Sequence, residues 1–331
     1  MGKVVGIFLL LVAVCVVTAV CNPQFLDAYN LANVVRRSSL FGIISIGVAF
    51  VIITGGIDLS IGSVVGLVGC VMLVLLGGVE QGGRGWHWAL VLPTVLAIAM
   101  AIGAVHGLLI TKVGLQPFVV TLCGLLVYRG LSRWIADDQT VGFGAGYHDP
   151  LFDLANTPIP IPGTSFDMPT SFFVLAALTV ISIVFLRRTV WGRHIFAVGS
   201  NERAARYAGV NTHRTKILAY VICSGLAGVA GMLFAFEYKA IQPANHGNFY
   251  ELYAIAAAVL GGCSLRGGEG SVLGVVIGAA TMRVIYNAIN LFGIPTQLEF
   301  AIIGTVILLG VSADEFVRRH LAKRRGLADS T

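Results

Sequence analysis

Charged residues are scarce in this chain, and their scarcity excludes a water-soluble fold. Only 11% of the 331 residues are Asp, Glu, Lys or Arg, whereas 56% are hydrophobic. A soluble domain typically carries about 25% charged residues. A soluble protein of this length could not hide so much apolar surface, because a large part of any folded chain stays in contact with water. The composition therefore indicates an integral membrane protein.

The chain also lacks the motifs of nucleotide binding, metal binding and hydrolytic catalysis. It contains no Walker A loop, no GxGxxG, no G-x-S-x-G and no H-E-x-x-H. The six cysteines form no C-x-x-C pair, so we expect small buried hydrophobic side chains rather than a disulfide framework or a zinc site. We therefore expect no catalytic residue, metal site or cofactor in this chain. If the chain moves a solute at the expense of ATP, then ATP and Mg²⁺ bind to a partner ATPase chain.

Apolar runs predict an all-α, polytopic bundle of about ten transmembrane helices that forms a single domain over residues 1–331. Several runs are shorter than the ~20 residues that cross the hydrocarbon layer unaided. The first run has no clear A-x-A cleavage site, so we expect an uncleaved helix rather than a signal peptide. Residues 22–39 are predicted to form a separate, partly amphipathic segment. The runs cover 4–21, 40–54, 60–77, 89–110, 117–136, 170–186, 216–237, 250–262, 271–290 and 296–312.

The distribution of basic residues predicts the orientation in the membrane. Seven of the 22 Lys and Arg residues lie in segment 187–216 and five lie in the tail 313–331. Segment 137–169 holds five acidic residues, five prolines and no Lys or Arg. Because cytoplasmic loops carry an excess of Lys and Arg, we expect both chain ends and the 187–216 loop in the cytoplasm and the 137–169 loop outside. We read the net charge of +6 as part of this asymmetry and expect no nucleic-acid partner.

Two glycine-rich breaks in the apolar pattern resemble each other. Residues 51–66 read VIITGGIDLSIGSVVG and residues 258–275 read AVLGGCSLRGGEGSVLGV. Both lie at the same depth and in the same orientation in the predicted topology. Paired, glycine-broken segments in two halves of a transporter point to its transport path, although glycine-rich breaks can also resemble each other by chance.

The first break carries an acidic residue, Asp58, between two short apolar runs. Asp58 and Ser60 are both good N-cap residues for a helix that starts near Ile61. Capping and shaping of the loop are favoured over direct contact with a substrate, because a carboxylate near the membrane is costly unless it is paired, hydrated or capping. A proton relay is a third interpretation, but no second carboxylate is paired with Asp58 in the sequence. Gly55 and Gly56 precede it in the same break.

A short amphipathic helix is predicted at 201–208 inside the basic loop. Asn201 or Ser200 can cap it, Glu202 lies in its first turn, and Gly209 can end it. Its arginines suit a helix that lies on anionic lipid. Alternatively, a short helix with fixed ends is a rigid projection that a groove on a cytoplasmic partner can grip.

Polar residues inside or beside the apolar runs are candidates for function, because intramembrane polar groups are costly. Arg129 and Arg133 lie near the predicted outer end of their run, so snorkelling to the interface explains them. Arg283 and Asn287 are better candidates to line a path, although hydrogen bonds between helices explain them at least as well. The full set is Gln116, Thr121, Arg129, Arg133, Glu237, Arg283, Asn287, Asn290 and Glu299.

Several of these stretches together resemble one known family. GGIDLSIGS at 55–63 is similar to the signature of the permease subunits of ribose/xylose/arabinose-type ABC importers, in the branched-chain amino acid/sugar permease superfamily. ERAARYAGV at 202–210 resembles the E-A-A-x-x-x-G coupling loop of that family, with Arg203 in place of the first Ala. The resemblance extends over about residues 20–315 and also includes QPFVVTL at 116–122, RG at 129–130, GRHIFAVGSN at 192–201 and residues 254–274.

The resemblance implies an ABC importer permease fold in a bacterial plasma membrane. Two permease subunits, identical or different, would form the pathway, a cytoplasmic sugar-type ATPase would dock on the coupling helices, and an extracytoplasmic binding protein would deliver a monosaccharide. The outer loop at 141–169 looks longer than is common in the family. The coupling helix would comprise Asn201, Glu202, Arg203, Ala204, Ala205, Arg206 and Gly209, and the candidates for the path or its gate are Gly55, Gly56, Asp58, Ser60, Gln116, Thr121, Arg283 and Asn287.

Two alternatives remain open from the sequence. A related permease could import a nucleoside, a branched-chain amino acid or a sugar-like signal molecule, because the binding protein does most of the selecting in such importers. A secondary transporter driven by ions or protons would instead need a partnered buried carboxylate or an ion site, and it leaves the 201–209 segment without a role.

Overall fold

The described part of the chain consists almost entirely of helices. The structure is a computed structural model, and it describes residues 2–77, 83–144, 152, 153, 155, 157–163, 166–305 and 308. The predicted all-α class is confirmed over these residues, with two short antiparallel strand pairs in addition. In chain order the elements are α1 (Gly2–Cys21), η1 (Pro23–Leu26), α2 (Ala28–Ile53), α3 (Ile61–Leu76), α4 (Trp88–Leu108), η3 (Leu109–Val113), α5 (Pro117–Ile135), β1 (Val141–Gly142), β2 (Ile159–Pro160), β3 (Asp167–Met168), α7 (Thr170–Arg188), α8 (Val190–Ser200), α9 (Glu202–Tyr207), α10 (Thr212–Tyr238), β4 (Ala240–Ile241), α11 (Tyr250–Leu260), α12 (Val272–Leu291) and η4 (Thr296–Leu298).

Seven segments of the described chain are helical, long and apolar enough to cross a membrane. These candidate spans are Val4–Cys21, Ala28–Ile53, Trp88–Val113, Pro117–Ile135, Thr170–Arg188, Thr212–Tyr238 and Val272–Leu291. The predicted runs 60–77 and 250–262 form α3 and α11, which are apolar but shorter. The tenth predicted run, 296–312, lies partly outside the described residues, and the predicted tail 313–331 lies wholly outside them.

Helix α2 is longer than the apolar pattern predicts. It begins at Ala28, where the Asp27 side chain accepts a hydrogen bond from the Tyr29 backbone N–H at 3.4 Å. Residues 22–39 are therefore not a separate segment but η1 and the first half of α2. The polar start of α2 is held against α12, because the amides of Asn30 and Asn287 bond to each other at 2.7 and 3.2 Å. Because Asn30 and Asn287 are far apart in the sequence, no local sequence pattern predicts this contact.

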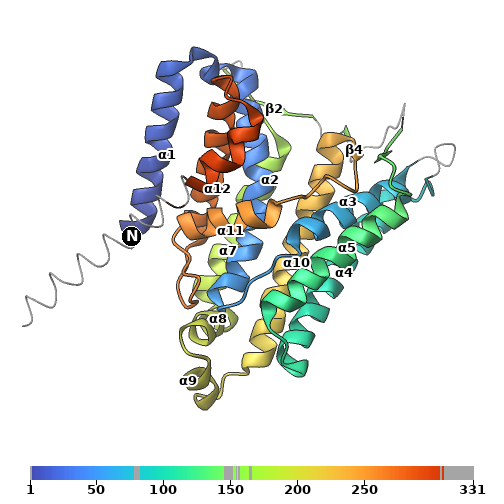
Figure 1. Cartoon of the computed structure of the whole chain (residues 1–331), viewed down its shortest axis with the longest axis vertical. Coiled ribbons are helices and arrows are strands. Elements are labelled where there is room, and N and C mark those ends of the chain that lie inside the picture. The colour runs from blue at the N-terminus through green and yellow to red at the C-terminus, as the bar shows by residue number, and fades with distance from the viewer. Residues whose placement is uncertain are drawn as a thin grey trace, which may run out of the picture.

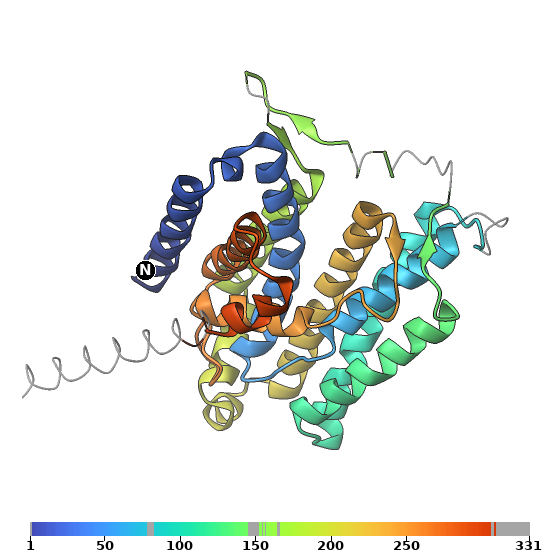
Figure 2. The ribbon, with the colours of Figure 1, turned by 45° about the horizontal axis from the view of Figure 1, so that its top comes forward.

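Helix α2 is the centre of the bundle. In the most apolar 18-residue stretch of α2, 83% of the stretch is buried inside the bundle, compared with 11% for the corresponding stretch of α1. α2 packs against α7, α10, α11 and α12, while α10 also contacts α3 and α4. α1 lies at the edge of the bundle against α12 (Figure 2). The helices therefore form two groups that α10 joins.

The two ends of the bundle are built from different elements. Helices α8 and α9 lie at one end, and the strand pairs lie at the other (Figure 1). β1 pairs with β4, and β2 pairs with β3, so part of the predicted 137–169 loop is ordered by short antiparallel pairs. α10 starts close to α9 and has 27 residues, which corresponds to a length of about 40 Å at 1.5 Å per residue. Its length matches the thickness of a bilayer with its headgroups.

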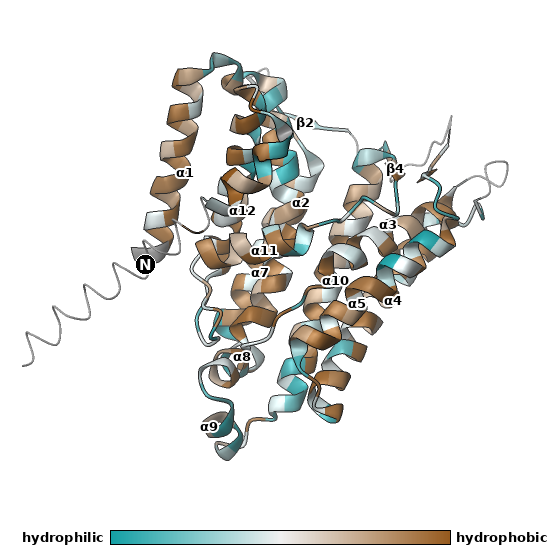
Figure 3. Cartoon of the chain, viewed as in Figure 1, coloured by the Kyte–Doolittle hydropathy of each residue, from teal (hydrophilic) through white to brown (hydrophobic). Residues whose placement is uncertain are grey.

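Hydrophobic residues predominate along most of the helices (Figure 3). Many of them are exposed on α1, α4, α5 and α7, which lie on the outside of the bundle. Water would not tolerate so continuous an apolar surface, whereas lipid does. Examples are Leu9 (61%), Leu90 (65%), Leu126 (66%) and Val180 (61%).

Candidate functional site

The predicted short helix is present as α9, between two turns that fix its ends. The Asn201 side chain caps it, because its Oδ1 accepts a hydrogen bond from the Ala204 N–H at 3.0 Å. Gly209 follows with a φ of +83°, a conformation that suits glycine. Ala205 packs inward at 5% exposure, while Tyr207 is 92% exposed. α9 therefore presents one polar and aromatic face away from the bundle, and Arg203 and Arg206 are exposed on it.

Glu202 links α9 to the first turns of α10. Its carboxylate forms an ion pair with Lys216 at 2.6 Å and a longer one with Arg206 at 3.4 Å. Partial burial raises the pKa of the Glu202 carboxyl, but the hydrogen bond and charge of Lys216, together with Arg206, outweigh it and hold the pKa below its ordinary value. A movement of α9 is therefore passed to α10 through a charged contact as well as through the chain.

The end of α8 packs between the two glycine-rich breaks. The Gly268 N–H donates to the Ile53 carbonyl at 2.8 Å, which joins the second break to the end of α2. A Cβ at Gly199 would overlap the Ile53 carbonyl oxygen and lie 2.5 Å from the Gly268 nitrogen. A Cβ at Gly267 would lie 2.8 Å from the Gly199 oxygen and 2.9 Å from the Gly55 nitrogen. We call this contact of residues 53–55, 199–200 and 267–268 the glycine junction.

The glycine junction bears on the two segments that resemble each other in sequence. Residues 51–66 and 258–275 lie about 200 residues apart in the chain, but their breaks touch in the fold. Gly55, Gly267 and Gly268 all have positive φ, between +76° and +85°. Glycine is needed there both for the backbone conformation and for the close approach of three chain segments.

Asp58 shapes the first break from a fully buried position. Its Oδ1 accepts hydrogen bonds from the Ser60 N–H at 2.9 Å and from the Ser60 hydroxyl at 2.7 Å. Both residues are 0% exposed. The prediction that Asp58 shapes the loop is confirmed, but Ser60 makes no side-chain capping bond to α3. Ser60 does occupy the predicted N-cap position of α3, but its hydroxyl donates to the Asp58 carboxylate instead of capping the helix.

Side chains from three other helices surround Asp58, and sequence reasoning missed them. Tyr220 of α10 donates to the Ile57 carbonyl at 3.0 Å. His106 of α4 and Tyr128 of α5 are joined by a hydrogen bond of 2.9 Å between Nε2 and the phenol oxygen. The rings of His106 and Tyr220 lie 6.4 Å apart in an edge-to-face arrangement. A lone His in an apolar run was the available signal for His106, but nothing local connects it to Asp58.

A second buried carboxylate lies near Asp58. Glu251, in the first turn of α11, is 7% exposed, and its Oε2 would be 2.5 Å from a Cβ at Gly62 of α3. Arg129 of α5 interacts electrostatically with Glu251. Arg129 also donates to the Pro243 carbonyl at 2.8 Å and to the carbonyl of His246. The snorkelling interpretation of Arg129 is therefore wrong, since the connection between α10 and α11 binds its guanidinium.

The other predicted path residues lie apart from Asp58. Arg283 stacks on the rings of Phe41 and Tyr286, with its guanidinium carbon 4.6 and 4.4 Å from their centroids. Asn287 pairs with Asn30, in line with the helix-to-helix interpretation. These two residues belong to the contact between α2 and α12.

Gln116 and Thr121 occupy the start of α5. Gln116 stands at the N-cap position and is exposed, but its side chain makes no capping hydrogen bond. Thr121 is fully buried and donates back to the Pro117 carbonyl at 2.9 Å. Gly56 lies beside the Tyr220 hydroxyl, which would be 2.8 Å from a Cβ there. The structure brings Gly55, Gly56, Asp58 and Ser60 together in the first break, and Gln116 and Thr121 belong to α5.

The described residues include no group of three His, Cys, Asp or Glu side chains placed to hold a metal ion. None of the six cysteines, all of which lie among the described residues, forms a disulfide. Cys70, Cys223 and Cys263 are buried as expected, whereas Cys21 and Cys123 are exposed on the apolar outer surface. The expectation of buried cysteines therefore holds for only part of the set, because side chains that face lipid count as exposed.

This combination defines a class of protein: a multi-pass membrane permease with a projecting helix at one end and broken helices packed behind it. The chain belongs to the family described as the permease component of the branched-chain amino acid transport system, whose model matches residues 30–311. It is thus a transport subunit of a bacterial ABC importer and not itself an ATPase. We found no solved structure that matches the chain.

Curated relatives match the chain over nearly its full length. The ribose import permease protein RbsC of Escherichia coli (strain K12) is 34% identical over 92% of this chain and 91% of its own. RbsC of Bacillus subtilis (strain 168) is 34% identical over 95% of this chain and 92% of its own. The xylose transport system permease protein XylH of Escherichia coli (strain K12) is 30% identical over 90% of this chain and 88% of its own.

Proposed function

We propose that the chain carries a monosaccharide of the ribose or xylose type across the membrane. The observation that carries this proposal is the similarity to ribose and xylose permeases over about nine-tenths of both chains. The alternative solutes, a nucleoside or a branched-chain amino acid, stay within the same family of permeases. An ion-driven transporter is less favoured, because it gives α9 no role.

The orientation that we propose places α9 in the cytoplasm and the strand pairs outside. The basic residues of segment 187–216 support this choice, because cytoplasmic loops are enriched in Lys and Arg. Both chain ends then lie in the cytoplasm. An extracytoplasmic binding protein would meet the end that carries β2 and β3, and a second permease subunit would complete the pathway.

We assign the ATPase contact to α9. Its cap at Asn201 and its end at Gly209 make it a rigid unit, and its exposed face carries Arg203, Arg206 and Tyr207. A rigid helix with exposed arginines suits a groove with acidic and apolar lining.

The glycine junction gives α9 a mechanical connection to the transport path. α8 directly precedes α9, and its last residues pack against the ends of α2 and of the second break. The Glu202–Lys216 ion pair adds a connection to α10, whose Tyr220 contacts the first break. A displacement of α9 by the ATPase would therefore reach both broken segments by two routes, and the residues around Asp58 would move with them.

An uptake assay tests the choice of solute. The chain is reconstituted into vesicles with its ATPase and binding protein, and uptake of radiolabelled ribose, xylose, a nucleoside and leucine is measured with and without ATP. We expect ATP-dependent uptake of a pentose or hexose and none of leucine. Uptake of leucine or the nucleoside in preference to every sugar would contradict the monosaccharide proposal.

A further inference from the structure

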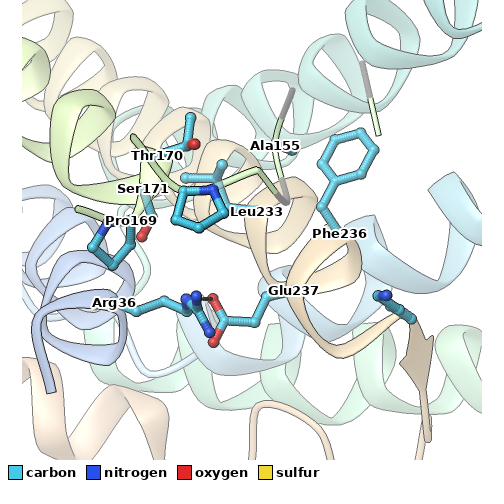
Figure 4. Close-up of a pocket in the computed structure, with 10 residues that line it drawn as sticks. Arg36, Ala155, Pro169, Thr170, Ser171, Leu233, Phe236 and Glu237 are labelled. Atoms are coloured by element: carbon cyan, nitrogen blue, oxygen red, sulfur yellow. Dashed lines mark ion pairs between the residues drawn. The ribbon is translucent and has the colours of Figure 1, made fainter. Parts of the chain in front are cut away.

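A cavity of about 250 Å³ lies beside the end of α10 that is remote from α9, and Figure 4 shows the residues that line it. Three helix segments form most of its wall: the first half of α2, the start of α7 and the end of α10. It is separate from the Asp58 cluster and from the glycine junction. Its lining residues are Arg36, Ala155, Pro158, Pro169, Thr170, Ser171, Leu233, Phe236, Glu237 and Lys239.

The floor of the cavity carries an ion pair with a long separation. The Arg36 Nε lies 3.8 Å from the Glu237 Oε2, which is longer than a hydrogen bond. The two side chains are 32% and 18% exposed, so a ligand can reach both of them. Arg36 makes one further bond, to Asn33 at 3.4 Å. A guanidinium has five N–H donors and a carboxylate has about four acceptor positions, so much of their bonding capacity is unused by the described residues.

Ser171 is an independent sign that the cavity receives a polar ligand. Ser171 is 7% exposed, and its hydroxyl has no hydrogen-bond partner among the described residues. Buried hydroxyls are normally bonded, because an unpaired one is costly. Ser171 lines the same cavity as Arg36 and Glu237, and Figure 4 shows its oxygen on the side of the ion pair.

The chemistry of the lining favours a small neutral polyol. Sugar hydroxyls both donate and accept hydrogen bonds, so they match a guanidinium, a carboxylate and a serine hydroxyl at once. The lining holds one carboxylate, Glu237, and two cations, Arg36 and Lys239. Because Arg36 is already paired with Glu237, the charges of the lining largely cancel, which favours a neutral ligand, and the polar floor would reject a lipid chain. The volume is below the ~300–1,000 Å³ typical of drug-sized ligands, which fits a single sugar ring. Leu233 and Phe236 supply an apolar wall for the ring face.

We infer that this cavity is a monosaccharide subsite within one permease subunit, at the end that faces the binding protein. The inference rests on the proposed function, since the orientation and the sugar class come from there. The subsite would hold sugar as it leaves the binding protein and before it enters the path between subunits. Arg36, Ser171 and Glu237 are the residues that contact the sugar hydroxyls.

The test measures sugar binding to the permease–ATPase complex in nanodiscs, without the binding protein. Ribose, xylose and the sugar acid ribonate are titrated and followed by saturation-transfer NMR. The variants are Glu237→Gln, Arg36→Lys and Ser171→Ala. Arg133→Gln is the matched control, because Arg133 pairs with Asp138 on the outer surface away from the cavity. Since Arg36→Lys keeps the charge and Ser171→Ala changes one atom, the comparison does not depend on one variant that fails to fold.

We expect the wild type and Arg133→Gln to bind a neutral sugar, and the cavity variants to bind it about tenfold more weakly or worse. Absence of sugar binding in the wild type, or equal binding in all four variants, would overturn the subsite. Tighter binding of ribonate than of ribose would overturn the assignment to a neutral ligand. ATP-dependent uptake is measured in the same preparation with the binding protein added. If uptake persists while subsite binding is absent, only the subsite fails; if the wild type takes up no sugar at all, the proposed function fails.

Discussion

Asp58 holds the start of α3 from a position without access to water. Its Oδ1 accepts two hydrogen bonds from Ser60, and the whole side chain is buried. A buried carboxylate with few partners is costly, and such groups persist where a backbone conformation or a function needs them. At this residue the need is visible, since Asp58 fixes the turn between the first break and α3.

Replacement of Asp58 separates its role as an acceptor from its charge. Asp58→Ala leaves the Ser60 N–H and hydroxyl without their partner, and we expect a loss of about 2 kcal/mol or more in stability. Asp58→Asn keeps an acceptor oxygen, so we expect a smaller loss. The midpoint of thermal unfolding in detergent measures both. Equal losses in the two variants would show that the charge and not the acceptor matters.

Glu202 predicts a dependence of stability on pH at the end of α9. The pKa of this carboxyl is held below its ordinary value of 4.5 in the folded chain. A carboxyl whose folded pKa is depressed stabilises the fold above its unfolded pKa, and this contribution is lost as the pH falls through the folded pKa. Because the Glu202 side chain is 38% exposed, the contribution is small, below about 1 kcal/mol.

The comparison of wild type with Glu202→Gln measures this contribution. We expect the wild type to be more stable at pH 6 and 7, and the difference to shrink as the pH falls below 4.5. Lys216→Gln is the control, because it removes the same ion pair from the other side. A difference that grows on acidification would contradict the assignment.

At the scale of elements, the glycine junction joins α8 to α2 and to the second break. Three segments far apart in the sequence approach so closely that their contact leaves no room for a side chain at Gly199. The hydrogen bond from Gly268 to Ile53 runs through the same contact. Close contact of this kind transmits displacement, because a close-packed interior has little free volume to absorb the movement of one segment.

A substitution that adds a single methyl group at Gly199 tests this connection. We expect Gly199→Ala to push α8 away from both breaks and to reduce ATP-dependent uptake at least tenfold, while the complex still hydrolyses ATP. Gly6→Ala in α1 is the matched control, because a Cβ there meets nothing within 4 Å. It should leave uptake unchanged and favour the helix by about 0.5–1 kcal/mol. Equal uptake in the two variants would show that the junction does not carry the coupling.

The sequence predicts single elements better than it predicts the contacts between them. The helix at 201–208 and nine of the ten apolar runs correspond to helices, because caps, glycine ends and apolar length act locally. The start of α2 at Ala28 was missed because a contact with α12, and not an apolar pattern, holds its polar half. The surroundings of Asp58 were missed for the same reason, since His106, Tyr128 and Tyr220 come from three different helices.

At the scale of the whole molecule, the action of an ATPase on α9 requires that this end of the bundle faces the cytoplasm. Exposed tips at the two ends provide positions for a label. Tyr207 of α9 is 92% exposed and Ile159 of β2 is 46% exposed. In right-side-out vesicles, from a background with every native cysteine replaced by serine, a membrane-impermeant maleimide should label Ile159→Cys and not Tyr207→Cys. Labelling of Tyr207→Cys alone would invert the topology.

In the proposed mechanism, α9 receives the action of an ATPase and thereby drives uptake through this chain. The most direct measurement is sugar uptake by vesicles that contain the permease, its ATPase and the binding protein, compared between the wild type and a variant with Glu202→Ala and Gly209→Val. We predict ATP-dependent uptake in the wild type and none in the variant, with the membrane bundle intact by thermal unfolding. Normal uptake in the variant, or uptake driven by an ion gradient without the ATPase, would contradict the account.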